Sequence, residues 1–147
     1  MDLTPVLVGG TVTGLTLVFH AAALAATAVV VRGMLRRLHG LRPFARMTIS
    51  MTVAGSLLTA AHFCEVIIWA MVYRTFAVAA KPDEWLYFAF VNYTTLGYGD
   101  VLAKPEWRLI GPITAADGII LFGLTTATLF HIINAADTDR PVTRPPL

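Results

Sequence analysis

The chain has 147 residues, of which 56% are hydrophobic, and its mean hydropathy is +0.69. This composition excludes an ordinary soluble domain and indicates a protein of the membrane interior. The net charge of +2 says little by itself, and we expect no nucleic-acid partner. Cys64 is the single cysteine, so an intrachain disulfide is excluded.

Three apolar runs are long enough to cross a bilayer as helices: residues 5–31, 48–73 and 109–134. Asp2 stands where a signal peptide carries basic residues, so we expect the first run to be a retained helix. A shorter apolar segment, 84–94, covers roughly half a bilayer at ~1.5 Å per residue. It suits a re-entrant helix buried in protein. The pattern predicts an all-α membrane protein with three transmembrane helices and one re-entrant helix.

The connection between the first two runs is rich in arginine. The positive-inside rule places it in the cytoplasm, so the amino terminus and the 84–100 loop lie outside and the carboxyl tail inside. Apolar residues interleaved through 33–47 leave two interpretations open: a short basic helix in the membrane surface, or a charged turn that only sets topology. In the first case anionic lipid headgroups bind the arginines, namely Arg32, Arg36, Arg37, Arg42 and Arg46.

The segment between the short apolar run and the third long run reads Thr-Thr-Leu-Gly-Tyr-Gly-Asp over residues 94–100. Stacked backbone carbonyls, with the Thr95 hydroxyl at the inner end, can replace the hydration water of a cation. Gly97 and Gly99 permit the backbone angles that aim successive carbonyls at one axis. Tyr98 can brace the loop from behind with its ring and hydroxyl.

Residues 87–100 resemble the pore helix and selectivity filter of potassium channels, and residues 118–127 resemble the inner helix of their simplest two-helix bacterial members. The resemblance covers about 48–134. It implies a homotetramer around a central pore, K+ as the permeant ion, no cofactor and no enzymatic activity. It also implies an integral protein of a bacterial plasma membrane. The ion-binding residues that it implies are Thr95, Leu96, Gly97, Tyr98 and Gly99, with Asp100 at the outer mouth.

Three features depart from the family pattern. Leu96 stands where valine is commonest, and Val91 stands where one bacterial type has a glutamate paired with the filter aspartate. The first helix is an addition to the two-helix pattern, as in small bacterial channels with an extra amino-terminal helix. We therefore divide the chain into an extra helix (1–32), a basic cytoplasmic or interfacial connection (33–47), the pore module (48–134) and a short cytoplasmic tail (135–147).

The third run contains two glycines, Gly118 and Gly123, that permit bending or close helix contact. Four of its residues share one face at helical spacing. That face lines a cavity in one interpretation, where an aromatic ring could form an apolar gate, and packs against other helices in the alternative. The four residues are Ile119, Phe122, Thr126 and Phe130.

Ionisable residues within membrane helices are functional candidates because leaving them unpaired is costly. His62, Glu65 and Asp117 occur at the depth expected for the filter, and Asn92 is a further candidate member. They form either a protonatable cluster that biases the filter or a structural hydrogen-bond network. A metal site at His62, Cys64 and Glu65 is not expected, because Cys64 points elsewhere on the helix. His20 and His131 we expect to be packed or interfacial.

The function predicted is passive conduction of K+, without a voltage sensor, because no arginine ladder crosses a helix, and without a ligand-binding domain. Two alternatives stay open. One is a non-selective cation channel of the same architecture, and the other is a non-conducting regulatory or scaffold subunit. The gating stimulus is left open among pH, lipid, tension and the filter itself.

Overall fold

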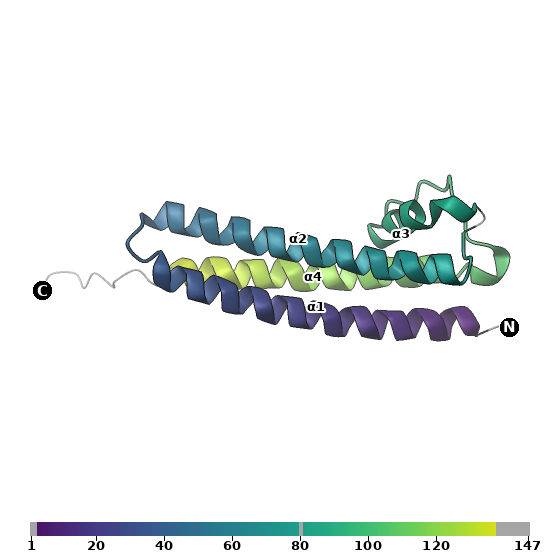
Figure 1. The fold of residues 1–147 in the computed structure, drawn as a ribbon, viewed down its shortest axis with the longest axis horizontal. Helices are drawn as coiled ribbons and strands as arrows, with labels where there is room; N and C mark the ends of the chain where they lie inside the picture. Colours follow the sequence, from purple (N-terminus) through teal and green to yellow (C-terminus); the bar gives the residue numbers. More distant parts are fainter. Residues whose placement is uncertain (1–2, 80, 138–147) are drawn as a thin grey trace, which may run out of the picture.

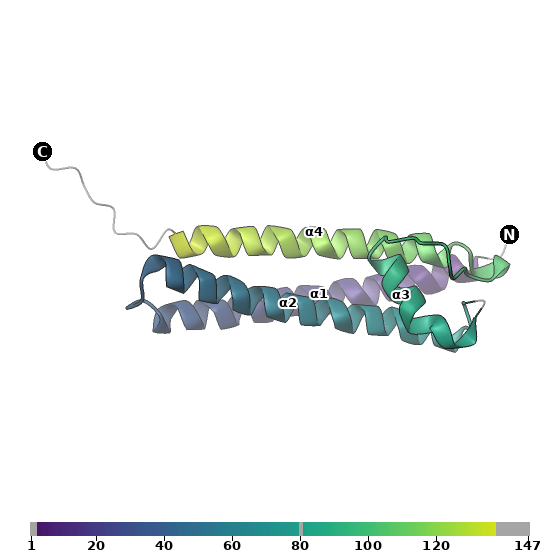
Figure 2. The same ribbon diagram turned by 90° about the horizontal axis from the view of Figure 1, so that it is seen from above.

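The computed structural model describes residues 3–79 and 81–137. Three long helices lie side by side along one axis (Figures 1 and 2), and each is long and apolar enough to cross a membrane. This confirms the predicted all-α fold with three membrane spans. The helices are α1 (Thr4–Arg37), α2 (Pro43–Thr75), α3 (Trp85–Tyr93) and α4 (Ile110–Asp137), with short 3-10 turns η1 (Pro82–Glu84) and η2 (Pro105–Trp107).

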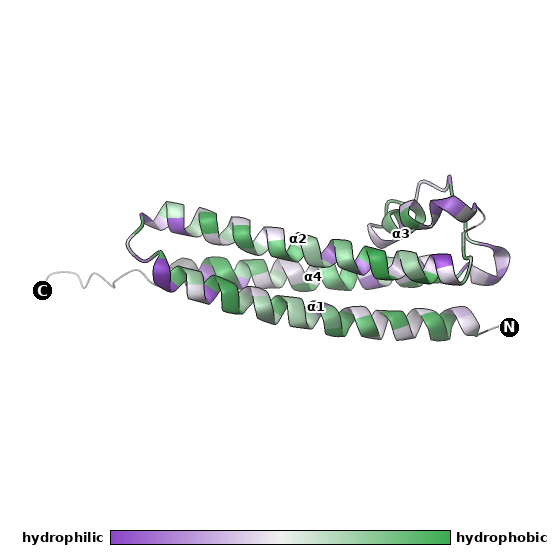
Figure 3. Cartoon of the chain, viewed as in Figure 1, coloured by the Kyte–Doolittle hydropathy of each residue, from purple (hydrophilic) through white to green (hydrophobic). Residues whose placement is uncertain are grey.

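The basic connection is a tight turn between two long helices. Helix α1 continues to Arg37, and α2 begins at Pro43, where a proline is tolerated because that position has no helical partner for an N–H. The interpretation of 33–47 as a separate basic helix is therefore wrong. Figure 3 shows hydrophilic residues at this turn and at the opposite end, with apolar helix bodies between them.

Helix α1 packs against both α2 and α4 through a narrow stripe of residues. Small and polar residues dominate the stripe, which lets helix backbones approach closely within a membrane. A Cβ on Gly9, for example, would lie 2.9 Å from the Ile113 side chain of α4. The other faces of α1 are apolar and exposed, as a lipid-facing helix requires. The buried stripe comprises Pro5, Gly9, Val12, Thr16, His20, Thr27 and Val31.

Helix α3 lies against α2 and α4 at the end of the bundle that carries the amino terminus (Figure 1). Its buried residues Phe88, Ala89 and Tyr93 join the main apolar core with Trp69 and Tyr73 of α2. The segment between the loop 94–100 and η2 is held against the segment that follows α2, because the backbone N–H of Lys104 donates to the carbonyl of Val78 at 2.9 Å. These contacts place the loop 94–100 beside α4, at the end of the bundle opposite the arginine-rich turn between α1 and α2 (the arginine turn).

Gly118 of α4 allows the closest approach between that helix and α3. A Cβ at this position would lie 2.0 Å from the backbone carbonyl oxygen of Tyr93, whereas nothing lies within 4 Å of a Cβ on Gly123. Backbone cannot move aside as a flexible side chain can. The two glycines that sequence treats alike therefore differ: Gly118 is required for packing against the residue that ends α3.

We predict that Gly118→Ala destabilises the protein while Gly123→Ala does not. Overpacking of this kind costs about 1–3 kcal/mol or more, because α3 must shift away from α4. Thermal unfolding of both variants in detergent measures the difference, and Gly123→Ala serves as the matched control. Equal melting temperatures for the two variants would contradict the close contact.

Candidate functional site

The loop that follows α3 has a regular alternation of backbone handedness. Thr95, Gly97 and Gly99 have φ angles of +59°, +59° and +77°, whereas Leu96 and Tyr98 between them do not have positive φ. In an extended segment of uniform handedness, successive carbonyls point to opposite sides. A left-handed residue at every second position turns neighbouring carbonyls toward the same side. The loop can therefore offer a column of carbonyl oxygens.

Thr95 is a β-branched residue in the left-handed region, which costs on the order of 1–3 kcal/mol. Two backbone hydrogen bonds hold the chain there. The N–H of Thr95 donates to the carbonyl of Asn92 at 3.0 Å, and the N–H of Leu96 donates to that of Val91 at 2.9 Å. The strained geometry is thus fixed by the last turn of α3.

The side chains of the loop receive little cover from their own chain. All seven residues of 94–100 are exposed, and the apolar or aromatic side chains of Leu96 and Tyr98 are 51% and 69% exposed. The predicted bracing by Tyr98 from behind the loop is therefore not supplied within one chain. Surfaces of this kind mark a place where another molecule packs.

Asp100 at the end of the loop is held by a residue that sequence reasoning missed. The hydroxyl of Tyr87 donates to Asp100 Oδ2 at 2.7 Å, and the backbone N–H of Val101 donates to Oδ1 at 3.1 Å. The Tyr87 hydrogen bond lowers the pKa of Asp100, and the same bond raises the pKa of Tyr87. The carboxylate therefore stays ionised and anchors the outer end of the loop to α3.

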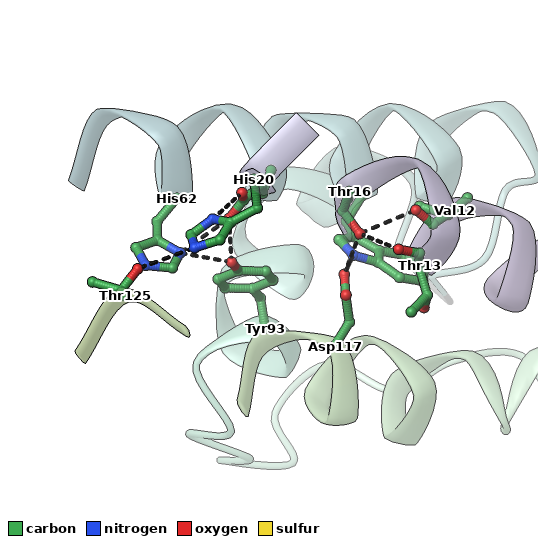
Figure 4. A network of polar contacts seen from close by, with 10 residues as sticks. Val12, Thr13, Thr16, His20, His62, Tyr93, Asp117 and Thr125 are labelled. Carbon is green, nitrogen blue, oxygen red and sulfur yellow. Dashed lines mark hydrogen bonds and ion pairs between the residues drawn. The ribbon is translucent and has the colours of Figure 1, made fainter. Parts of the chain in front are cut away.

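Glu65 of α2 is fully buried, and its partners His20, His62 and Tyr93 come from α1, α2 and α3 and lie close to one another (Figure 4). His20 Nδ1 of α1 lies 2.7 Å from its Oε1, and His62 Nδ1 lies 3.0 Å from its Oε2. The hydroxyl of Tyr93, the last residue of α3, donates to Oε2 as well. Thr125 of α4 completes the group, its hydroxyl lying 2.9 Å from His62 Nε2 and 3.2 Å from His20 Nε2. We call these five residues the Glu65 cluster.

Asp117 does not belong to the Glu65 cluster, contrary to the expectation of one polar group. Its Oδ2 accepts hydrogen bonds of 2.8 Å from the indole N–H of Trp69 and from the Thr16 hydroxyl (Figure 4). Its Oδ1 is buried without a hydrogen-bond partner among the described residues. Asp117 therefore ties α4 to α1 and α2.

Asn92 lies in a third polar group. Its side-chain amide donates to the Tyr73 hydroxyl at 3.2 Å, and that hydroxyl lies 2.8 Å from the Thr114 hydroxyl. The four candidates His62, Glu65, Asn92 and Asp117 are thus distributed over three neighbouring groups, which all join α2 to the helices around it.

The candidate cavity face of α4 is mostly uncovered in the single chain. Ile119 and Phe130 are 61% and 65% exposed, and Thr126 is exposed too. Phe122 differs, because its ring lies 4.5 Å from that of His62 and 5.5 Å from that of Tyr93, centroid to centroid. Phe122 therefore covers the Glu65 cluster.

Sequence reasoning also missed the contribution of α1 to the site. His20, expected to be merely packed or interfacial, is fully buried and contacts Glu65, and Thr16 contacts Asp117. A usable signal was present: Val12, Thr16 and His20 recur at four-residue spacing, which places them on one face of an apolar helix. Polar residues on such a face mark the side that packs against protein.

A family model described as an ion channel matches residues 61–135, just over half of the chain. The match includes the second half of α2, all of α3, the loop 94–100 and nearly all of α4, and it leaves out α1. Comparisons with curated proteins and with solved structures give no match.

We predict that Tyr87→Phe lowers the melting temperature by a constant amount across about pH 5 to 8. A carboxylate whose pKa is lowered on folding stabilises the protein above its unfolded pKa, about 3.9 for Asp, and loses that contribution as the pH falls through the folded value. The difference from wild type should therefore shrink below about pH 4. Thermal unfolding across this pH range measures it.

The matched control is Tyr87→Phe in an Asp100→Asn background, where the acid dependence should disappear because no carboxylate remains. A Tyr87→Phe effect that grows in acid would contradict the role assigned to the Asp100 carboxylate.

Proposed function

Since the chain belongs to the ion channel family of the small two-transmembrane potassium channels, we propose that it is a potassium-selective channel subunit that conducts K+ passively. The ion-binding residues are those of the loop 94–100, hereafter the filter: the carbonyls of residues 95–99 and the Thr95 hydroxyl replace the hydration shell of the ion. Asp100 shapes the outer mouth. No covalent chemistry or cofactor takes part in this function.

The alternation of handedness at Thr95, Gly97 and Gly99 is the observation that carries the proposal. An ordinary connecting loop has no reason to keep a strained threonine between two helices, and a column of carbonyls explains it. Helix α3 ends at Tyr93, two residues before Thr95, so the negative end of the α3 dipole supports a cation there.

We propose that four chains assemble around one axis. One chain supplies a single filter loop, which cannot surround an ion. The exposed side chains of Leu96 and Tyr98 and the exposed face of α4 at Ile119 and Phe130 offer the apolar surfaces that neighbouring chains would cover. In this assembly Tyr98 braces the filter from behind against a neighbouring chain.

We propose that the filter faces outward across the membrane. The arginine turn lies at the end of the bundle opposite α3 (Figures 1 and 3), and the positive-inside rule places that turn in the cytoplasm. The amino terminus is then outside. Arginines at the ends of both helices, Arg36 and Arg37 in the last turn of α1 among them, lie where anionic headgroups would bind.

The test is ion flux through purified protein reconstituted in liposomes. We expect K+ flux that Ba2+ blocks, with much slower Na+ flux, because the carbonyl column matches the dehydrated K+ ion. Gly99→Ala is the variant to compare, since its φ of +77° strains any residue with a Cβ and nothing crowds the position otherwise. We expect that variant to form tetramers and to lose selective flux.

The two alternatives give different results. Equal Na+ and K+ flux would mean a non-selective cation channel and would direct attention to Leu96. Absence of flux from a verified tetramer, in the presence of correct insertion, would favour a regulatory or scaffold subunit and would overturn the proposal.

A further inference from the structure

The Glu65 cluster holds a set of metal-binding atoms that conduction of K+ does not use. His20, His62 and Glu65 each offer one ligand atom, these atoms lie within 4.8 Å of one another, and all three residues are buried. We propose that they bind one divalent transition-metal ion of the zinc class per chain, with the Tyr93 hydroxyl as a fourth donor. The proposal concerns binding alone, so it does not depend on whether the protein conducts.

The donor spacing is close to what zinc requires. Bonds of about 2.0–2.1 Å in a tetrahedral site place neighbouring donors about 3.3 Å apart. His62 Nδ1 lies 3.0 Å from Glu65 Oε2 and 2.8 Å from the Tyr93 hydroxyl, and His20 Nδ1 lies 2.7 Å from Glu65 Oε1. His20 contacts one carboxylate oxygen and His62 the other, so an ion between the two rings would bind both oxygens or would require the carboxylate to turn. The ligand atoms of the three residues already lie within 4.8 Å of one another.

The position of Thr125 is a second, independent observation that points to a cation. The Nε2 atoms of His20 and His62 both face its hydroxyl oxygen, at 3.2 and 2.9 Å. That oxygen has two lone pairs and can accept an N–H from each ring. In that pair of tautomers the Nδ1 atoms carry lone pairs toward the Glu65 carboxylate, and a cation between them removes the repulsion. Ligating histidines usually hold their other N–H on an oxygen in this way.

The negative charge of the Glu65 carboxylate also favours a divalent cation at this site. A carboxylate at membrane depth is costly without a positive partner. Among the described residues Glu65 forms ion pairs with His20 and His62, and a histidine is positive only when protonated. A divalent ion supplies the charge without protonating either ring. Two imidazoles and a carboxylate select zinc-class ions over K+ or Mg2+, which prefer oxygen ligands only.

One side of the site is partly exposed in the single chain. The His62 side chain retains 11% of its exposure, and it lies beside the Phe122 ring, which is 38% exposed. The other members, His20 and Glu65, are fully enclosed. Once bound, the ion would cross-link α1 and α2 to the last residue of α3, next to the filter.

Metal content measured by mass spectrometry tests the proposal. Purified tetramer is treated with a chelator, incubated with Zn2+ alone and dialysed. We expect one zinc per chain in wild type and at least tenfold weaker retention in His20→Ala and Thr125→Val, since loss of a supporting oxygen alone costs about 10–100-fold. The matched controls are His39→Ala, His131→Ala and Cys64→Ser, which remove exposed metal-binding side chains outside the site and should retain zinc.

A second measurement needs no variant and therefore does not depend on whether His20→Ala folds. Co2+ added to the wild-type protein gives intense visible absorption in a tetrahedral site of nitrogen and oxygen ligands and weak absorption when it stays hydrated. We expect the intense spectrum and its loss on adding Zn2+. A weak spectrum would overturn the proposal, and so would loss of bound zinc in His39→Ala or His131→Ala. Protons on both Nδ1 atoms would then occupy the positions assigned to the metal.

Discussion

The carboxylate of Glu65 is the interaction on which the rest of the arrangement depends. It is buried in α2. One of its oxygens contacts His20 of α1, and the other contacts His62 of α2 and the hydroxyl of Tyr93 in α3. A buried carboxylate in a membrane must satisfy its lone pairs within the protein, so the helices that carry its partners are held at fixed depth and rotation. Helix α1, which the family match leaves out, is in this way connected to the residue that ends α3.

Tyr93 connects the Glu65 carboxylate to the filter through its side chain and its backbone. Its hydroxyl contacts Glu65, its ring lies beside that of Phe122, and its carbonyl lies where any Cβ on Gly118 would clash. Two residues later, Thr95 adopts its left-handed geometry. Strain of this kind persists only where the surroundings over-determine it. Side chain and backbone of Tyr93 are both fixed, so the strained start of the filter rests on a rigid base.

Local features of the sequence predicted the three spans and the short helix, because apolar run length acts within one segment. For the basic connection the sequence left a surface helix and a turn open, and the structure has the turn, with Pro43 beginning α2. The grouping of polar residues was misjudged: sequence gives the depth of Asp117 and Glu65, but the rotation of each helix, which sends Asp117 to Trp69, is set by packing. The four-residue spacing of Val12, Thr16 and His20 marks the packing face of α1, but it does not say that this face meets Glu65, because that contact depends on how α1 packs against α2.

A double-mutant cycle between His20 and Tyr93 tests whether the Glu65 carboxylate couples α1 to α3. The two residues lie on different helices, and both contact the Glu65 carboxylate. The measurement is the free energy of unfolding in detergent for His20→Ala, Tyr93→Phe and the pair. We predict a coupling of about 1 kcal/mol or more through the shared carboxylate. Effects that add to within about 0.5 kcal/mol would contradict it, and α1 would then be a neighbour of the pore with no energetic connection to the filter.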